Sequence, residues 1–268
     1  MVPGSSPGGP TKLKYKMEKF DDNLKIIDTK FGKIVVNIND QYIGKAFLNQ
    51  NYWGLNDILA ISKIIELKCK NKDKIIFYDV GANIGSHSIA LSNILKNRIF
   101  IRAFEAQSNI YQMFNKAIKI NKINNIELYN KAVSDKNDEV LRIELPDYSK
   151  FNNFGGLELQ KPFKNSDNFN MKKSGLYEDI KTIKLDNFDE EVDFIKMDIE
   201  GMENLVINGS KNLITKFRPY LFIELLKTNR EDIINFFKEN DYKIYLKGFD
   251  AFVIPNESKV NLHGLKKL

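Results

Sequence analysis

The sequence is poor in cysteine, histidine and tryptophan, and it has no long hydrophobic run. Its 268 residues include one cysteine, Cys69, together with two histidines and one tryptophan. A single cysteine excludes an intrachain disulfide framework and a cysteine-rich metal site. No apolar stretch reaches the roughly 18 residues of a membrane-spanning helix, and no signal-peptide core is present. We therefore expect a protein without a membrane span that works in the reducing cytoplasm.

The charge balance shows only a mild excess of basic residues. Lysine and arginine number 41 against 35 for aspartate and glutamate, which gives a net charge of +6 and a pI near 9.0. The lysines are scattered and form no extended basic tract. This pattern favours a solvated, lysine-rich surface, so no nucleic-acid partner is expected.

The composition changes along the chain and suggests three parts. Residues 1–19 begin with MVPGSSPGGP, which has no periodicity, and we expect a flexible tail or a cloning remnant there. Residues 20–74 are expected to form an N-terminal extension, with short strands at 33–38 and 42–48. A helix is predicted over 56–67, because its apolar residues fall on one face. The remainder, 75–268, is predicted to be the main domain.

From residue 75 onward, short apolar runs alternate with segments of helical periodicity. Strands are predicted over 75–79, 98–104, 126–133, 192–197 and 220–224, and helices over 86–96, 108–121, 202–216 and 230–240. Apolar strands joined by helices indicate a parallel sheet covered on both faces. Two further strands, 242–246 and 251–254, are joined by a link short enough for a hairpin only. The sequence thus predicts an α/β fold with a mostly parallel sheet that ends in an antiparallel hairpin.

Residues 146–180 interrupt the alternation. The segment combines glycines and prolines with several phenylalanines and shows no regular period. A long irregular stretch inside a compact domain is typically a functional loop. We expect a substrate-side insertion here, in a position to act as a lid.

The most informative motif is FYDVGANIGSHSIA. An apolar run ends at the acid Asp79, and the chain then breaks at Gly81 and Gly85 before a helix begins at Ser86. A strand, a glycine turn and a helix N-terminus let a nucleotide-type ligand approach the backbone closely. The G-x-x-x-G spacing differs from the pyrophosphate-binding G-x-G-x-x-G pattern. An acid before the turn suits a ligand with an ammonium and a sulfonium, so the motif predicts S-adenosylmethionine (SAM).

Polar side chains also follow the next two predicted strands. Glu105 stands where a carboxylate can accept both ribose hydroxyls of a nucleoside, and this role is favoured over capping of the next helix. Ser134 and Asp135 follow the third strand, where they either bind an adenine amino group or form a simple turn.

The segment FIKMDIEGMENL carries candidate catalytic residues. Lys196 and Asp198 share one face of a strand, and burying them together is unfavourable unless they pair or act on a ligand. Glu200 is equally suited to capping the following helix, whereas Glu224 ends the next strand and is expected to point into the crevice. The proton acceptor is left open among Asp198, Lys196, Glu224 and His87. Histidine titrates near neutral pH and can take a hydroxyl proton.

Four segments together resemble the FkbM family of SAM-dependent methyltransferases. They are FYDVGANIGSHSIA, FEAQSNIYQMFNKAIKIN, KAVSD, and the pair TIKLDNFD…VDFIKMDIEGMENLVINGS and RPYLFIEL, in family order over about residues 75–225. The resemblance implies a Rossmann-like class I methyltransferase fold. It also implies methylation of a sugar hydroxyl, in a surface polysaccharide such as a capsule or lipooligosaccharide, or in another glycoconjugate.

The same resemblance implies roles for individual residues. The methionine part of SAM would be held by Asp79, Gly81, Asn83 and Gly85. Glu105 would hold the ribose, and Val133 and Ser134 would lie near the adenine. The substrate side would be bordered by Asp198, Glu200 and Glu224.

Other functions stay open at this point. The acceptor of a methyltransferase can also be RNA or a small phosphorylated metabolite, and a protein that binds SAM without catalysis would keep the same motifs. No metal is assigned, but a metal-assisted transferase would use Asp198, Glu200, Glu224 and His87 with Mg²⁺ or Mn²⁺. The sequence is compatible with a homo-oligomer and does not decide it.

Overall fold

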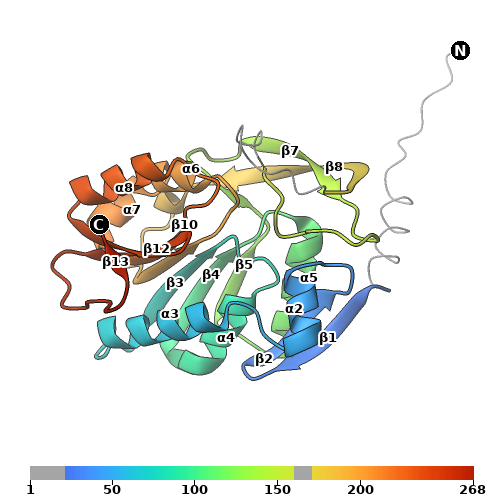
Figure 1. Ribbon diagram of the computed structural model, residues 1–268, viewed down its shortest axis with the longest axis horizontal. Helices are drawn as coiled ribbons and strands as arrows, with labels where there is room; N and C mark the ends of the chain where they lie inside the picture. Colours follow the sequence, from blue (N-terminus) through green and yellow to red (C-terminus); the bar gives the residue numbers. More distant parts are fainter. Residues whose placement is uncertain (1–21, 160–170) are drawn as a thin grey trace, which may run out of the picture.

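An eight-stranded sheet forms the centre of the computed structural model, which describes residues 22–159 and 171–268 (Figure 1). Its strands, in spatial order, are β13 (Lys266–Lys267), β11 (Tyr242–Lys247), β12 (Asp250–Pro255), β10 (Tyr220–Glu224), β9 (Phe194–Met197), β3 (Ile75–Val80), β4 (Ile99–Phe104) and β5 (Ile126–Tyr129). The five strands from β10 to β5 run parallel to one another. β12 lies antiparallel between β10 and β11, so the predicted parallel sheet with a terminal hairpin is confirmed.

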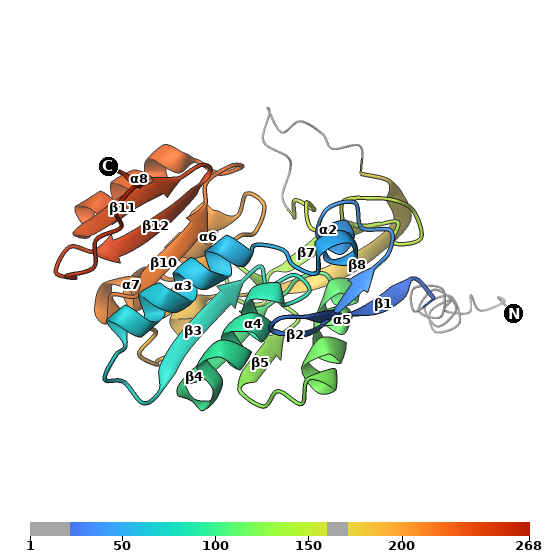
Figure 2. The same cartoon turned by 60° about the horizontal axis from the view of Figure 1, so that its bottom comes forward.

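Helices cover both faces of this sheet, because each central strand is apolar on both sides. One face carries α3 (Leu55–Lys68), α4 (Ser86–Leu95) and α5 (Ser108–Ile120), which Figure 2 shows in front of the parallel strands. The other face carries α6 (Glu203–Asn208), α7 (Lys211–Phe217) and α8 (Arg230–Glu239). Within β3, Phe77 packs into the first core and Tyr78 into the second, as the alternation of a strand requires. The parallel strands thus place all their carboxyl ends along one edge.

One expected helix and one expected strand are each divided in two in the structure. The predicted helix over 202–216 consists of α6 and α7, separated at Gly209, where a Cβ would lie 2.1 Å from the Ser134 carbonyl oxygen. The predicted strand over 126–133 consists of β5 in the main sheet and β6 (Ala132–Val133) in another sheet. The chain leaves the main sheet at Asn130, whose side chain donates to the carbonyl oxygens of Glu105 and Ala106.

A separate three-stranded sheet includes the end of the expected insertion, 146–180, together with strands that precede it. β6, β8 (Lys173–Ile183) and β7 (Val140–Pro146) form it in the order β6-β8-β7, with β7 antiparallel to β8. The expectation of irregular chain throughout 146–180 is therefore wrong for the part that forms β8. Residues 147–159 form no strand or helix longer than a single bridge, between Asp40 and Asn152. Residues 160–170 and the expected tail 1–19 lie outside the described part of the chain.

The N-terminal extension contributes a hairpin and two helices. β1 (Leu24–Thr29), which was not predicted, pairs with β2 (Gly32–Asn37), and α3 confirms the helix expected over 56–67. The strand expected over 42–48 is wrong, because this segment is the helix α2 (Ile43–Gln50). Asp40 starts this helix: its Oδ1 accepts the Tyr42 N–H at 3.0 Å, and its carbonyl oxygen accepts the Lys45 N–H. None of the helices within the described ranges is both long and apolar enough to cross a bilayer.

Candidate functional site

The glycine turn after β3 packs directly against the loop after β9. Gly81 has φ +75°, and a Cβ at this position would lie 1.9 Å from the carbonyl oxygen of Asp198. Gly85 has φ +83°, and its Cβ would lie 2.2 Å from the ring of Phe114 on α5. Both positions therefore require glycine, for the backbone conformation and for the missing side chain. The turn is held close to β9 and to α5 at the carboxyl edge of the sheet.

Glu105 lies directly after β4 and connects the glycine turn to the start of α5. Its Oε2 accepts the backbone N–H of Asn83 and its Oε1 accepts that of Gln107, both at 2.9 Å. The residue is buried, and this burial raises the pKa of its carboxyl to about 7, although the two backbone N–H groups oppose the shift. The Glu105 carboxylate is thus fixed in orientation and keeps lone pairs for further donors.

A cleft opens between the glycine turn and the insertion. It has a volume of about 470 Å³, within the range of small-ligand sites. Four of the seven predicted cofactor residues line it: Gly81, Asn83, Glu105 and Val133. Apolar residues of the insertion, Leu157 and Leu159, line the same cleft. The Glu105 carboxylate beside an apolar wall and a side-chain-free turn is a donor set that fits an adenosine with its ribose.

The other three predicted cofactor residues lie outside the lining of this cleft. Asp79 is fully buried, Ser134 is 1% exposed and donates its backbone N–H to Ile183, and Gly85 contacts Phe114. Asp79 and Ser134 directly adjoin lining residues in the chain, Val80 and Val133.

Asp79 forms a buried polar cluster with residues of β9 and α4. Its Oδ2 accepts a hydrogen bond from Ser88 Oγ at 2.6 Å, and its Oδ1 lies 3.2 Å from Lys196 Nζ. Lys196 Nζ also donates to the Gly81 carbonyl oxygen at 3.0 Å and lies 3.7 Å from Asp198 Oδ2. Burial alone would lower the pKa of Lys196, but the two aspartates outweigh it and raise this pKa. Lys196 is therefore held as an ammonium group.

A second cleft, of about 710 Å³, lies beside the first and shares part of its wall. The shared residues are Gly81, Asn83, Gly155, Asp198 and Glu200. The second cleft is also lined by four predicted catalytic residues: His87, Lys196, Asp198 and Glu224. The structure thus brings all four together, next to the cleft that fits an adenosine.

His87 lies in the first turn of α4 and is 9% exposed. Burial, followed by the charge of Lys196, lowers the pKa of its imidazole to about 4, so the ring is neutral at neutral pH. Its Nε2 has no hydrogen-bond partner within residues 22–159 and 171–268. A neutral imidazole can accept a proton, and the lowered pKa makes this one a weak base.

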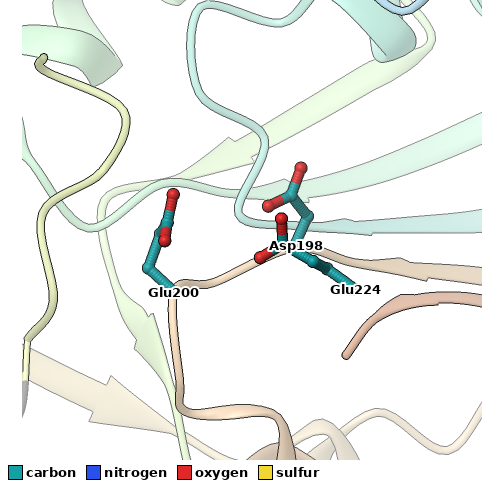
Figure 3. A group of neighbouring side chains, drawn as sticks. All are labelled: Asp198, Glu200 and Glu224. Atoms are coloured by element: carbon teal, nitrogen blue, oxygen red, sulfur yellow. The ribbon is translucent and has the colours of Figure 1, made fainter. Parts of the chain in front are cut away.

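The carboxylates of Asp198, Glu200 and Glu224 gather at the ends of β9 and β10 (Figure 3). One oxygen of each lies within 4.8 Å of the others. Glu200 pairs with Lys227 Nζ at 2.6 Å. Burial, reinforced by the two neighbouring acids, raises the pKa of Glu224 to about 9. The Glu224 Oε2 atom finds no hydrogen-bond partner in the described chain.

Sequence reasoning missed several residues of these clefts. Tyr42 and Trp53 line the second cleft, although both come from the N-terminal extension. Lys227, which holds Glu200, follows β10, and no pattern in the sequence pairs the two. The single tryptophan of the chain was the one available signal, because an isolated Trp in a polar loop often marks a binding surface.

Comparisons with known proteins identify the family of the chain. Residues 79–244, more than half of the chain, match the Methyltransferase FkbM domain. Among curated proteins, no relative is found. The first similar solved structure is an FkbM methyltransferase from Methylobacillus flagellatus KT, with 18% identity and a TM-score of 0.46. The match covers 68% of this chain and 43% of that one, so it spans less than half of that protein.

Two further solved structures are similar over most of the chain. M. jannaschii TYW2 in complex with AdoMet has 13% identity and a TM-score of 0.41, covering 86% of this chain and 83% of that one. The METTL16 methyltransferase domain has 11% identity and a TM-score of 0.48, covering 92% of both chains. The assignment to a family rests on the match to the family model, and SAM is the cofactor of this family. The chain belongs to the FkbM family of methyltransferases.

Proposed function

We propose that the protein transfers the methyl group of SAM to a sugar hydroxyl, during synthesis of a surface polysaccharide (capsule or lipooligosaccharide) or another glycoconjugate. The observation that carries this proposal is the lining of the second cleft, which combines the aromatic residues Tyr42 and Trp53 with amides and carboxylates such as Asn153 and Glu224. A sugar presents hydroxyls to polar groups and an apolar C–H face to aromatic rings. We name this space the acceptor cleft.

The first cleft is assigned to the cofactor. Glu105 accepts the ribose hydroxyls, Val133 and Leu157 flank the adenine, and Gly81 allows the backbone to approach the methionine part. The family resemblance implied that Asp79 holds the methionine part. We propose instead that Asp79 acts through Lys196, because it pairs with the ammonium group that binds the Gly81 carbonyl oxygen. Gly81, Asn83 and Asp198 line both clefts, which supports an assignment of the reacting groups to the space between them.

SAM supplies an electrophilic methyl group, so the protein need not form a nucleophile from its own side chains. Its residues must align an acceptor oxygen at about 3 Å and remove the hydroxyl proton. Two groups of the acceptor cleft are suited to take this proton: the partly exposed Asp198 and the neutral His87. Lys196 remains protonated, so its role is to position Asp198 and the Gly81 carbonyl.

The acceptor assignment is tested with purified protein, SAM and a panel of nucleotide-linked sugars, with mass spectrometry of the products. We expect a gain of one methyl group on a sugar hydroxyl. Trp53→Ala should raise the KM for the sugar without changing the affinity for SAM, and Trp53→Phe should restore it. Tyr52→Ala is the matched control, because the exposed Tyr52 does not line the acceptor cleft. Methylation of none of the sugars, with methylation of RNA or of a phosphorylated metabolite, would refute the proposal.

The charge of the acceptor cleft argues against those alternative acceptors. The carboxylates of Asp198 and Glu200 would repel a phosphate. RNA binding can be recognised separately, because it would weaken steeply as salt rises. Asp198→Asn should abolish transfer while SAM still binds. A biological role that survives this substitution would instead indicate a non-catalytic SAM-binding protein. We place the protein in the cytoplasm, in line with its single buried thiol, Cys69.

A further inference from the structure

Three carboxylates meet at the floor of the acceptor cleft, and their spacing matches the ligands of one metal ion. Figure 3 shows the carboxylates of Asp198 and Glu224 beside each other, with that of Glu200 facing them. One oxygen of each lies within 4.8 Å of the other two. Oxygen ligands on opposite sides of Mg²⁺ or Ca²⁺ are about 4 to 5 Å apart, since each lies about 2.1 to 2.5 Å from the ion.

The positive charges near this cluster leave it incompletely neutralised. Lys227 contacts Glu200 at 2.6 Å, but it also contacts Glu158 at 3.3 Å. Lys196 is closer to Asp79, at 3.2 Å, than to Asp198, at 3.7 Å. Glu224 has a buried oxygen without a hydrogen-bond partner in the described chain. A buried carboxylate in this position needs either a proton or a cation.

A second observation points independently to a ligand at this position. His87 lines the same cleft, is 9% exposed, and has a ring nitrogen without a partner in the described ranges. Buried polar atoms of native proteins nearly always have a partner, which a bound group supplies where the protein does not. His87 belongs to α4, whereas the three carboxylates follow β9 or end β10. Unsatisfied groups from separate elements thus converge on one space.

We infer that Asp198, Glu200 and Glu224 bind a divalent cation of the Mg²⁺ or Mn²⁺ type. An all-oxygen set of carboxylates suits such hard cations. The cation holds the acceptor oxygen and makes its hydroxyl more acidic. As the new carbon–oxygen bond forms, the carbon–sulfur bond of SAM breaks and its electron pair stays on sulfur. The hydroxyl proton passes to His87 Nε2. This inference rests on the proposed function, which identifies the acceptor group as a sugar hydroxyl.

The test is Mn²⁺ binding, measured by electron paramagnetic resonance on the chelator-treated full chain without SAM or acceptor. We expect one bound ion per chain and binding at least about ten-fold weaker in Glu224→Gln. Glu200→Gln should weaken binding similarly. Glu158→Gln is the matched control, because Glu158 also contacts Lys227 but lies outside the cluster, and it should bind Mn²⁺ normally.

Two results would overturn the inference. One is the absence of Mn²⁺ binding to the unchanged protein, and the other is equal binding in the Glu224→Gln and Glu200→Gln variants. If one variant fails to fold, as judged by circular dichroism, Mn²⁺ binding to the other variant still tests the inference. If methyl transfer persists after chelation, the cation has no part in catalysis, whereas the proposed function stays intact. Metal binding without methylation of any sugar would instead refute the proposed sugar acceptor, while the inferred metal site would still be supported.

Discussion

Lys196 and Asp79 form a buried ion pair between directly paired residues of the neighbouring strands β9 and β3. Their charged atoms lie 3.2 Å apart, and the side chains are 3% and 0% exposed. Lys196 also holds the carbonyl oxygen of Gly81, and Asp79 accepts the hydroxyl of Ser88 on α4. One buried pair therefore fixes the glycine turn relative to the first turn of α4 and to the strand that carries Asp198.

Removing the cation of this pair should strongly destabilise the fold. Lys196→Met leaves the Asp79 carboxylate buried without its partner, and such a loss typically costs about 3–5 kcal/mol. Urea denaturation should show this drop in the free energy of unfolding. Lys216→Met is the control, because the Lys216–Asp189 pair is exposed and contributes at most about 1 kcal/mol. Equal stability of the two variants would contradict the account.

The two glycines Gly81 and Gly248 should respond differently to alanine. Both have positive φ, +75° and +63°, but a Cβ at Gly248 would meet nothing within 4 Å. Gly248→Ala should therefore cost only about 1–2 kcal/mol of backbone strain. Gly81→Ala adds a clash with the Asp198 carbonyl, so it should unfold the turn and abolish binding of S-adenosylhomocysteine in calorimetry. Tight binding by a folded Gly81→Ala variant would rule out this packing.

The ionisation of Glu105 should make folding stability depend on pH. Because its pKa rises from 4.5 to about 7 on folding, the folded state binds the extra proton in this interval. Its contribution to stability is present below pH 4.5 and is lost as pH rises through about 7. The difference between the unchanged protein and Glu105→Gln, measured by urea denaturation from pH 5 to 8, isolates this effect from Lys196 and Asp79 nearby. A difference that does not vary with pH would argue against a buried Glu105.

Ribose binding requires the ionised form of Glu105, so ligand affinity should change in the opposite direction. Binding of S-adenosylhomocysteine should tighten as pH rises through about 7 and should release a proton. Calorimetry in two buffers of different ionisation enthalpy measures this release. Glu105→Gln should bind weakly and release none.

The insertion should depend on a hydrogen bond from Tyr148. Its hydroxyl donates to Gln107 Oε1 at 2.7 Å, and Gln107 Nε2 donates to the Phe154 carbonyl oxygen at 3.0 Å. Tyr148→Phe should cost about 1–2 kcal/mol and speed proteolysis between 146 and 159. The exposed Tyr177 provides the control, Tyr177→Phe, which should leave the cleavage rate unchanged. Slow cleavage in both variants would show that other contacts anchor the insertion.

The sequence was sufficient for the parts of the fold that follow strand periodicity. β3, β4, β9 and β10 are apolar on both faces, so their parallel order and their shared carboxyl edge were predictable. Because Glu105, Asp198 and Glu224 all stand at this edge, their convergence was predictable as well. A strand-end position fixes where a residue lies without fixing its partner.

Local hydrogen bonds and tertiary contacts decided the rest. The strand expected over 42–48 is a helix because Asp40 caps it locally, and the strand over 126–133 breaks because Asn130 binds the carbonyl groups after β4. Trp53 reaches the acceptor cleft only through the packing of the N-terminal extension on the main domain. The buried ion pair of Asp79 with Lys196 likewise depends on the pairing of β3 with β9, which periodicity does not specify.

Hydrogen–deuterium exchange with and without S-adenosylhomocysteine tests the position of the cofactor most directly. We predict protection of the glycine turn, residues 79–88, and of 103–107 around Glu105. The apolar groove of about 630 Å³ lined by Ile34, Phe47 and Ile58 should show no change. Protection confined to that groove, with unchanged exchange at 79–88 and 103–107, would contradict the account.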